Sequence, residues 1–387
     1  MKKIYLDHNA TTPVLPEVFE AMRPYFMEEF GNASSIHGYG RVARVVIEES
    51  RQKIAAILQC APDEIVFTSG GTESDNLAIK GGAWAKKDSG KHIITSAIEH
   101  HAVLESCRYL KKTGFEVTYL KPDRLGRIAS ETLKQAIRSD TILISIMHAN
   151  NETGVIQDIP SMSKIALESG IAFHTDAVQS TGKIPYSIPE LGIEMLSISA
   201  HKFYGPKGVG LLYIKKKTKI MPLNHGGSHE NNKRAGTENV PGIVGLAKAL
   251  EVAQRDLLDE TNRLAKIKSI FVDGVKKRIR DIEIIGDQQN CIPNTVCISF
   301  KGIEGESIVL SLDLKGIAVS SGSACSSGSV NASHVILAMG IPPEQAHGII
   351  RFSFGRTNSE SDIVYILDVL EQEIARIRSI SPLYGKA

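Results

Sequence analysis

The sequence has no long apolar run: among its 387 residues, no window approaches the roughly 18 apolar residues of a membrane span. The start MKKIYLDHNATTPVLPEV has only IYL between its lysines and Asp7, so the hydrophobic region of a secretory signal is also missing. Neither sign of charge is in large excess: the 45 Lys and Arg residues nearly balance the 43 Asp and Glu residues, and the net charge is +2. We therefore expect a cytoplasmic protein that acts on a small molecule, without a membrane or nucleic-acid partner.

Cysteine is also scarce and lacks a recognisable spacing. The cysteines are odd in number and form no C-x-x-C pair; they are Cys60, Cys107, Cys291, Cys297 and Cys325. This argues against a disulfide framework and against a zinc site, so we expect no metal. With 42% hydrophobic and 23% charged residues, the composition is that of an ordinary globular protein. Any functional cysteine is therefore expected to be a free thiol.

Short β-branched runs alternate with helical periodicity from Glu64 to about Lys215. Strands are expected at 64–69, 92–98, 115–120, 141–149, 171–178, 195–200 and 209–214, and helices at 72–87, 100–112, 130–139 and 162–169. This alternation predicts an α/β fold whose mainly parallel sheet is covered on both faces. Ligands bind at the carboxyl ends of such strands, where the segments SISAHK, FHTDA and IMHANN all end.

A second unit follows a long helical stretch that runs from about Pro241 to Asp281. The later segments NTVCISF, EGESIVLSLDL, HGIIRFSF and SESDIVYILDVLEQEIARIRSI predict a smaller α+β arrangement. We expect residues 16–255 to form a large α/β domain. Residues 1–15 and 256–387 are expected to form a small domain that carries Cys325.

A glycine-rich turn, SGGT at Ser69 to Thr72, lies between a predicted strand and a predicted helix. Backbone N–H groups at a helix N-terminus bind phosphate, and the helix dipole favours the negative charge. The same four residues are also typical of an ordinary strand-to-helix turn, with Thr72 or Ser74 as the N-cap of the helix. The spacing of a nucleotide P-loop is absent.

Two charged residues end neighbouring strands at the same sheet edge. Asp176 follows IAFHT, and Lys202 follows LSISAH. A buried carboxylate needs a cationic partner, and desolvation lowers the pKa of a lysine and makes it nucleophilic. An Asp facing a ring nitrogen and a Schiff-base lysine are typical of a pyridoxal 5'-phosphate (PLP) site, although a simple Asp176–Lys202 ion pair would also explain both residues.

Eight segments together resemble the cysteine desulfurases of the NifS/IscS type. They are YLDHNATTP, GGTESDNLAI, HANNETGVIQDI, HTDAVQSTGKIP, SISAHKFYGPKGVG, RAGTENVPGIVG, SSGSACSSGS and IIRFSFGR, and they occur in the family's order over nearly the whole chain. That family consists of fold-type I PLP enzymes related to the class-V aminotransferases. The resemblance implies a mainly parallel seven-stranded sheet in the large domain.

The resemblance also implies which residues hold PLP. Lys202 would form the covalent link, Asp176 would face the pyridine nitrogen, and His100 would stack on the ring and assist proton transfer. The remaining implied cofactor contacts are Gly71, Thr72, Ser199 and His201 at the phosphate, Gln179 at the ring hydroxyl, and Asn151 at the ring or the substrate. Thr237 matches a threonine that reaches the phosphate of the neighbouring subunit, which implies a homodimer.

Arg351 and Cys325 are the residues that the resemblance assigns to the substrate. Arg351 would clamp the carboxylate of L-cysteine, a task that suits the bidentate guanidinium. Cys325 lies in the small-residue stretch VSSGSACSSGSVNAS, which has little to bury. The chain from Cys325 to Ser333 spans up to about 26 Å when extended. Its thiol can therefore travel between the cofactor and an external acceptor.

The implied reaction converts L-cysteine to L-alanine and leaves a persulfide on Cys325, which an iron–sulfur scaffold or another sulfur-carrier protein accepts. The uses of that sulfur in the family include iron–sulfur cluster assembly and tRNA modification. A selenocysteine lyase, or another PLP-dependent lyase or aminotransferase of the same fold, remains an alternative. A catalytically silent scaffold is the alternative from another class.

Overall fold

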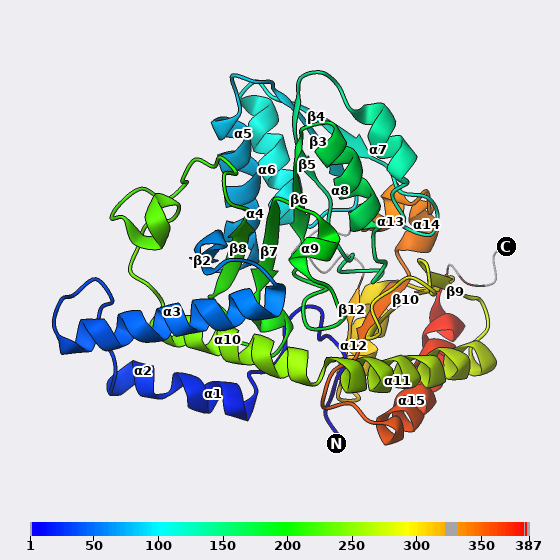
Figure 1. Ribbon diagram of the computed structural model, residues 1–387. Helices are drawn as coiled ribbons and strands as arrows, with labels where there is room; N and C mark the ends of the chain where they lie inside the picture. Colours follow the sequence, from blue (N-terminus) through cyan, green and yellow to red (C-terminus); the bar gives the residue numbers. More distant parts are fainter. Residues whose placement is uncertain (1, 322–331, 383, 385–387) are drawn as a thin grey trace.

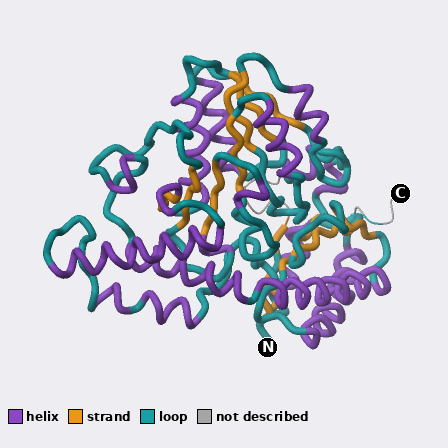
Figure 2. The backbone as a smooth tube through the Cα atoms, viewed as in Figure 1, coloured by secondary structure: helices purple, strands orange, loops and turns teal. Residues whose placement is uncertain are grey.

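The computed structural model describes residues 2–321, 332–382 and 384 of the chain. Cys325 lies outside these residues. Strands occupy the centre of the larger unit and helices lie on both sides of them (Figure 2). No helix in the described part of the chain is long and apolar enough to cross a membrane.

A seven-stranded sheet forms the centre of the larger unit (Figure 1). Its order is β2-β8-β7-β6-β5-β3-β4, with bounds β2 Ile65–Thr68, β3 His92–Ser96, β4 Glu116–Leu120, β5 Thr141–Ser145, β6 Ala172–Asp176, β7 Met195–Ser199 and β8 Gly210–Ile214. Only β8 runs antiparallel to its neighbours. The predicted α/β fold with a mainly parallel seven-stranded sheet is confirmed.

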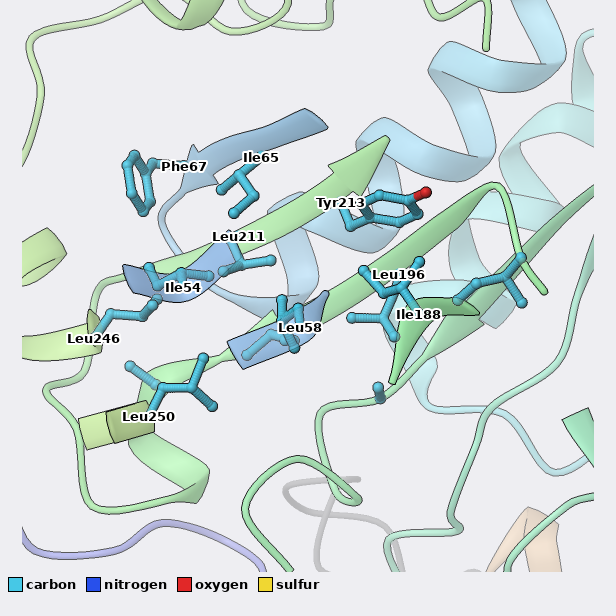
Figure 3. Packing of buried hydrophobic residues seen from close by; sticks show 14 of the residues in the cluster. Ile54, Leu58, Ile65, Phe67, Ile188, Leu196, Leu211, Tyr213, Leu246 and Leu250 are labelled. Carbon is cyan, nitrogen blue, oxygen red and sulfur yellow. The ribbon is translucent and has the colours of Figure 1, made fainter. Parts of the chain in front are cut away.

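Side chains alternate between the two faces of this sheet, and each face has its own apolar core. Ile65 and Phe67 of β2 pack with Leu211 and Tyr213 of β8 on one face, whereas Val66 points to the other face. Helices α3 and α10 cover the first of these faces through residues such as Ile54, Leu58, Leu246 and Leu250 (Figure 3). Both faces of a parallel sheet must be covered in this way, because its strands are apolar on both sides.

The helices of the larger unit fall into two layers. One layer packs on the face that carries Phe67 and comprises α3 Gly38–Leu58, α7 Ser130–Ala136, α8 Ile159–Glu168, α9 Ile188–Leu191 and α10 Val240–Arg255. The other layer comprises α4 Gly71–Asn76, the π-helical turn η2 Leu77–Gly81, α5 Gly82–Ala85 and α6 His101–Lys112. Shorter elements are α1 Pro16–Met22, α2 Pro24–Met27 and the 3-10 turns η1 Pro62–Glu64, η3 Ala200–Lys202 and η4 His229–Asn232.

The second unit contains a four-stranded antiparallel sheet of order β12-β13-β10-β9. Its strands are β9 Ile282–Ile285, β10 Thr295–Phe300, β12 Ser320–Ser321 and β13 Ile349–Ser353. The surrounding helices are α11 Leu257–Arg278, α12 Gly305–Asp313, α13 His334–Ala338, α14 Pro343–Ala346 and α15 Glu360–Ile380. The N-terminal strand β1 (Ile4–Tyr5) pairs with β11 (Ile317–Ala318), so the start of the chain joins this unit.

The prediction of one continuous helical stretch from about Pro241 to Asp281 is wrong in one respect, because two helices occupy this stretch. α10 ends at Arg255 and α11 begins at Leu257. At the break, the Asp256 carboxylate accepts hydrogen bonds from Arg255 Nε and from Arg356 Nη1, both at 2.6 Å. This side-chain pairing depends on a residue a hundred positions away, so helical periodicity does not reveal it. The division of the chain between residues 255 and 256 stays a prediction.

Candidate active site

A cavity of about 400 Å³ lies at the carboxyl edge of the seven-stranded sheet. The ends of β6 and β7, the turns after β2, β3 and β5, residues of the N-terminal segment and strand β13 all contribute to its wall. Of the predicted site residues, it is lined by Gly71, Thr72, His100, Asn151, Asp176, Gln179, Ser199, His201, Lys202 and Arg351. Residues separated by as many as 280 positions thus meet at one place, as the rule for strand ends predicts for most of them.

Asp176 ends β6 and is only 5% exposed. Its Oδ1 accepts a hydrogen bond from the backbone N–H of Val178 at 2.8 Å. Burial raises the pKa of Asp176 to about 6, although the Val178 hydrogen bond and the charge of Lys202 lower it in part. A buried carboxylate of this kind is stabilised by a cationic N–H donor that enters the cavity.

A second buried carboxyl group, Asp75, shares this wall and was missed by sequence reasoning. Its Oδ1 lies 3.6 Å from His174 Nε2, and no hydrogen bond reaches that oxygen within the described part of the chain. Burial, followed by the negative charge of Asp176, raises the pKa of Asp75 well above its ordinary value. Burial and the neighbouring charge of Asp176 thus both disfavour the ionised form of Asp75.

Lys202 lies in η3, directly after β7. Its Nζ donates hydrogen bonds to the backbone carbonyls of Asn9 at 2.7 Å and Ala10 at 2.9 Å. Backbone carbonyls hold an amine in place without exchanging a proton with it. The charge of Lys202 lowers the pKa of Asp176, but it ranks after burial and the Val178 hydrogen bond as a cause. The charge of Lys202 thus influences the pKa of this carboxyl group less than its burial does.

His100 caps the N-terminus of α6, where its Nδ1 accepts a hydrogen bond from the backbone N–H of Ala102 at 3.1 Å. Burial, and then the positive charge of Lys202, lower the pKa of His100 to about 4. The ring is therefore neutral at physiological pH. Because Nδ1 is the acceptor, the single ring proton is assigned to Nε2. His100 accordingly presents a neutral ring with an N–H donor at Nε2.

The first turn of α4 and the residues after β7 form one end of the cavity. A Cβ atom at Gly71 would lie 2.7 Å from Val178 Cγ2, so only glycine lets the backbone pass this closely. Ser199 and His201 line the same cavity, and His201 Nδ1 lies 3.1 Å from Thr11 Oγ1. Burial, aided by Lys202, lowers the pKa of His201 to about 4. The backbone N–H groups of this turn and the nearby hydroxyl groups suit an anionic phosphate.

Arg351 lies at the middle of β13 and is 4% exposed. Its Nη1 donates to the backbone carbonyl of Asn151 at 2.9 Å, and its Nη2 donates to Asp7 Oδ1 at 2.7 Å. Among the described residues, no acceptor reaches Arg351 Nε. The guanidinium group is therefore held in a fixed orientation and retains an unsatisfied donor, which suits a substrate carboxylate.

The structure does not test the predicted roles of two site residues. Thr237 is exposed on the segment before α10. Its predicted role belongs to the site of a neighbouring subunit, which the structure of one chain does not test. Cys325 lies outside the described residues, so its role also stays a prediction.

Sequence reasoning missed three further residues around the cavity: Asp7, Asn9 and Lys183. Asp7 binds Arg351, while Asn9 and Lys183 bind each other and Gln179. All three lie within segments that carried the family resemblance. Asn9 and Lys183 are 174 positions apart, so no local pattern predicts that they meet.

A larger cavity, of about 720 Å³, lies between α3 and the segment around η4. Its wall contains Arg51 and Glu230, which satisfy each other through two hydrogen bonds of 2.8 and 2.9 Å. The smaller cavity at the sheet edge brings together the amine of Lys202, the buried carboxylate of Asp176 with its raised pKa and the unsatisfied Nε of Arg351. These properties are typical of active sites, so we assign the chemistry to the smaller cavity.

Comparison with known proteins identifies relatives over the full length of the chain. The family model for class-V aminotransferases matches residues 4–366. A protein from Dictyoglomus turgidum described as cysteine desulfurase IscS is 58% identical, over 98% of this chain and 97% of the relative. A solved structure described as a NifS-like protein is 40% identical, with a TM-score of 0.91, and covers 97% of this chain and 100% of its own. Another, described as SspA in complex with cysteine, is 37% identical, with a TM-score of 0.82, and covers 91% and 99% respectively.

Proposed function

Because the chain belongs to the class-V aminotransferase family, we propose that it is a PLP-dependent cysteine desulfurase that converts L-cysteine to L-alanine. The observation that carries the proposal is the meeting of Asp176, Lys202 and Arg351 around one cavity. Asp176 supplies a buried carboxylate, Lys202 an amine, and Arg351 a cation on the opposite sheet. The description of one structural relative as a complex with cysteine supports this choice of substrate.

The side chains around the cavity fit PLP. The backbone N–H groups of the first turn of α4, which begins at Gly71, suit the phosphate, and the buried carboxylate of Asp176 suits the pyridine nitrogen. Lys202 would hold the aldehyde carbon, the neutral ring of His100 would stack against the pyridine, and Gln179 would meet the ring hydroxyl. When bound, PLP supplies an electron sink that stabilises negative charge at the α-carbon of the substrate.

The chain's own residues then bind the substrate and move its protons. Arg351 would hold the carboxylate of L-cysteine, and Asn151, which lines the same cavity, would contact the cofactor or the substrate. The amine of Lys202, when it is free, would remove the α-proton of the substrate as a general base. His100 would assist proton transfer through a hydrogen bond from its neutral Nε2–H group, since Nδ1 is engaged with Ala102.

Cys325 takes the sulfur atom in this proposal. Its thiolate would attack the sulfur of the substrate, and the bond between that sulfur and the β-carbon would break. The β-carbon would gain the proton that the substrate thiol gives up and the α-carbon would regain the proton it lost, so that L-alanine leaves and a persulfide remains on Cys325. An iron–sulfur scaffold or a sulfur-carrier protein then accepts the sulfur, as the family resemblance implies. The cytoplasmic location expected from the sequence stays a prediction.

An exposed apolar surface supports the expected homodimer. Phe26, Met27, Ile36 and Tyr39 are 57%, 74%, 93% and 56% exposed, on α2, on the loop before α3 and at the start of α3. These elements lie at one edge of the molecule (Figure 1). Contiguous exposed apolar side chains are typical of protein interfaces. We expect the dimer to place Thr237 of each subunit at the phosphate in the other.

The experiment that tests the proposed function is an assay of L-alanine formed from L-cysteine, with and without a thiol reductant. The protein should bind PLP and form alanine together with sulfane sulfur. Cys325→Ala should bind PLP equally well but stop alanine formation. Full turnover by this variant would remove Cys325 from the mechanism.

The alternatives predict other outcomes of the same assay. An aminotransferase would consume a keto acid and form no sulfane sulfur, and a selenocysteine lyase would use selenocysteine in strong preference to cysteine. A silent scaffold would bind no PLP. Any of these results would contradict the proposed desulfurase.

A further inference from the structure

Lys183 is a buried lysine that the proposed chemistry does not use. It lies seven positions after Asp176 and is 9% exposed. No carboxylate forms an ion pair with its nitrogen among the described residues. Burying an amine without a counter-charge costs free energy, so packing alone does not explain a lysine at this position.

The nitrogen of Lys183 acts as a donor to two side-chain amides. It donates to Gln179 Oε1 at 2.7 Å and to Asn9 Oδ1 at 3.2 Å. Burial, followed by the positive charges of Lys202 and Arg351, lowers the pKa of Lys183 well below its ordinary value. A neutral amine still has two N–H groups, which is enough for both acceptors. Lys183 can therefore donate both hydrogen bonds whether its amine is charged or neutral.

These hydrogen bonds decide which way the Gln179 amide faces. Its oxygen must point to Lys183, so its NH₂ group points the other way and donates to the backbone carbonyl of Asn9 at 2.9 Å. The amide NH₂ has a second hydrogen, and Gln179 lines the cavity. The same Asn9 carbonyl accepts from Lys202 at 2.7 Å. Lys183 thus stands behind the cavity wall and orients groups that face into it.

We propose that Lys183 is a positioning residue that fixes the Gln179 amide with an N–H group toward the ring hydroxyl of the cofactor. Lys183 does not itself touch the cofactor, since it is absent from the cavity wall. Without Lys183, only the hydrogen bond to the Asn9 carbonyl still orients the amide, and the amide oxygen, left without its donor, competes with the nitrogen for the position that faces the hydroxyl. The proposal rests on the proposed function, because it requires PLP in this cavity.

The test measures the dissociation constants of PLP and of a PLP analogue that lacks the ring hydroxyl, both with apo-protein. The preference of the parent protein for PLP should fall about tenfold in Lys183→Met, the value of one hydrogen bond of about 1.4 kcal/mol. Gln179→Ala should lose the same preference, and the double variant should lose no more than either single one. Lys183→Arg, which keeps donors at this position, should restore part of it.

A matched control is Lys268→Met. Lys268 is also 9% exposed, but it lies on α11 and donates to Cys291 Sγ at 2.8 Å. This variant should keep the full preference for PLP. A thermal unfolding curve for each variant establishes that it is folded, and the Arg variant carries the test if Lys183→Met does not fold.

The outcomes separate the two proposals. If the parent protein binds no PLP, the proposed function fails and this inference fails with it. If the parent protein binds PLP and the folded Lys183→Met retains the same preference, only the role of Lys183 is overturned. Additive losses in the double variant would also overturn it, because Lys183 would then act independently of Gln179.

Discussion

The two sheets contribute to the cavity in different ways. The seven-stranded sheet supplies residues at or just after the carboxyl ends of its strands, such as Asp176, Ser199 and Lys202. The four-stranded sheet supplies Arg351 from the middle of β13, opposite Cys297 and Ser320 on the neighbouring strands. In the proposed function, the first sheet holds the cofactor and the second selects the substrate.

The difference follows from sheet topology. In a parallel sheet the carboxyl ends meet at one edge, and the chain leaves each strand there as a loop that can carry polar groups. An antiparallel sheet has no such common edge, so it presents a side chain from within a strand. We therefore expect variants on the two sheets to affect different measurable quantities.

The largest effect is expected from Asp176→Asn on the seven-stranded sheet. Removing one charge of a buried pair costs about 3–5 kcal/mol, so PLP should bind about a hundredfold to a thousandfold more weakly to the apo-protein. Asp75→Asn is the matched control and should change this affinity much less, because Asp176, and not Asp75, is the proposed partner of the pyridine nitrogen. Equal losses in both variants would contradict the assignment of the charge to Asp176.

A smaller effect, on another quantity, is expected from Arg351→Gln on the four-stranded sheet. Its kcat/KM for L-cysteine should fall about thirtyfold or more, mostly through a higher KM, because a buried charged contact to the carboxylate is lost. PLP affinity should stay unchanged. Arg356→Gln is the control, since Arg356 binds Asp256 and lies outside this cavity. Weaker PLP binding by Arg351→Gln would break the division between the sheets.

The smallest effect is expected on the free energy of unfolding, from a residue that follows a strand of the seven-stranded sheet. Glu99 is buried between β3 and α6, where its Oε1 accepts hydrogen bonds from Ser96 Oγ at 2.5 Å and from the backbone N–H of Met147 at 3.0 Å. Burial raises the pKa of Glu99 to about 8. In the unfolded chain this carboxyl ionises near its ordinary value, about 4.5, so the folded state loses stability as pH rises from about 4.5 to 8.

Glu99→Gln keeps the shape of the side chain but cannot ionise. Its free energy of unfolding in urea should match that of the parent protein at pH 4 and exceed it by about 2 kcal/mol at pH 6. Glu283→Gln, at a half-buried position on β9 of the other sheet, should follow the parent curve at both pH values. A pH-independent difference for Glu99→Gln would refute the raised pKa.

The sequence predicted the parts of the site that follow from strand order. Period-two and helical patterns predicted the seven strands, and the strand ends predicted that Asp176 and Lys202 share an edge. Local patterns could not predict the position of Arg351, because a mid-strand arginine has no such signal; only the family resemblance indicated it. The contacts of Asn9 with Lys183, and the pairing of Asp75 with Asp176, depend on the tertiary fold and were missed for that reason.

The most direct test of the central claim is to find which lysine binds the cofactor. The protein loaded with PLP would be reduced with borohydride, digested, and the modified peptide identified by mass spectrometry. We predict that the cofactor is fixed on the peptide that contains Lys202, and that Lys202→Ala shows no such product. Fixation on Lys183 or on any lysine outside the cavity, or no fixation in the parent protein, would contradict the account.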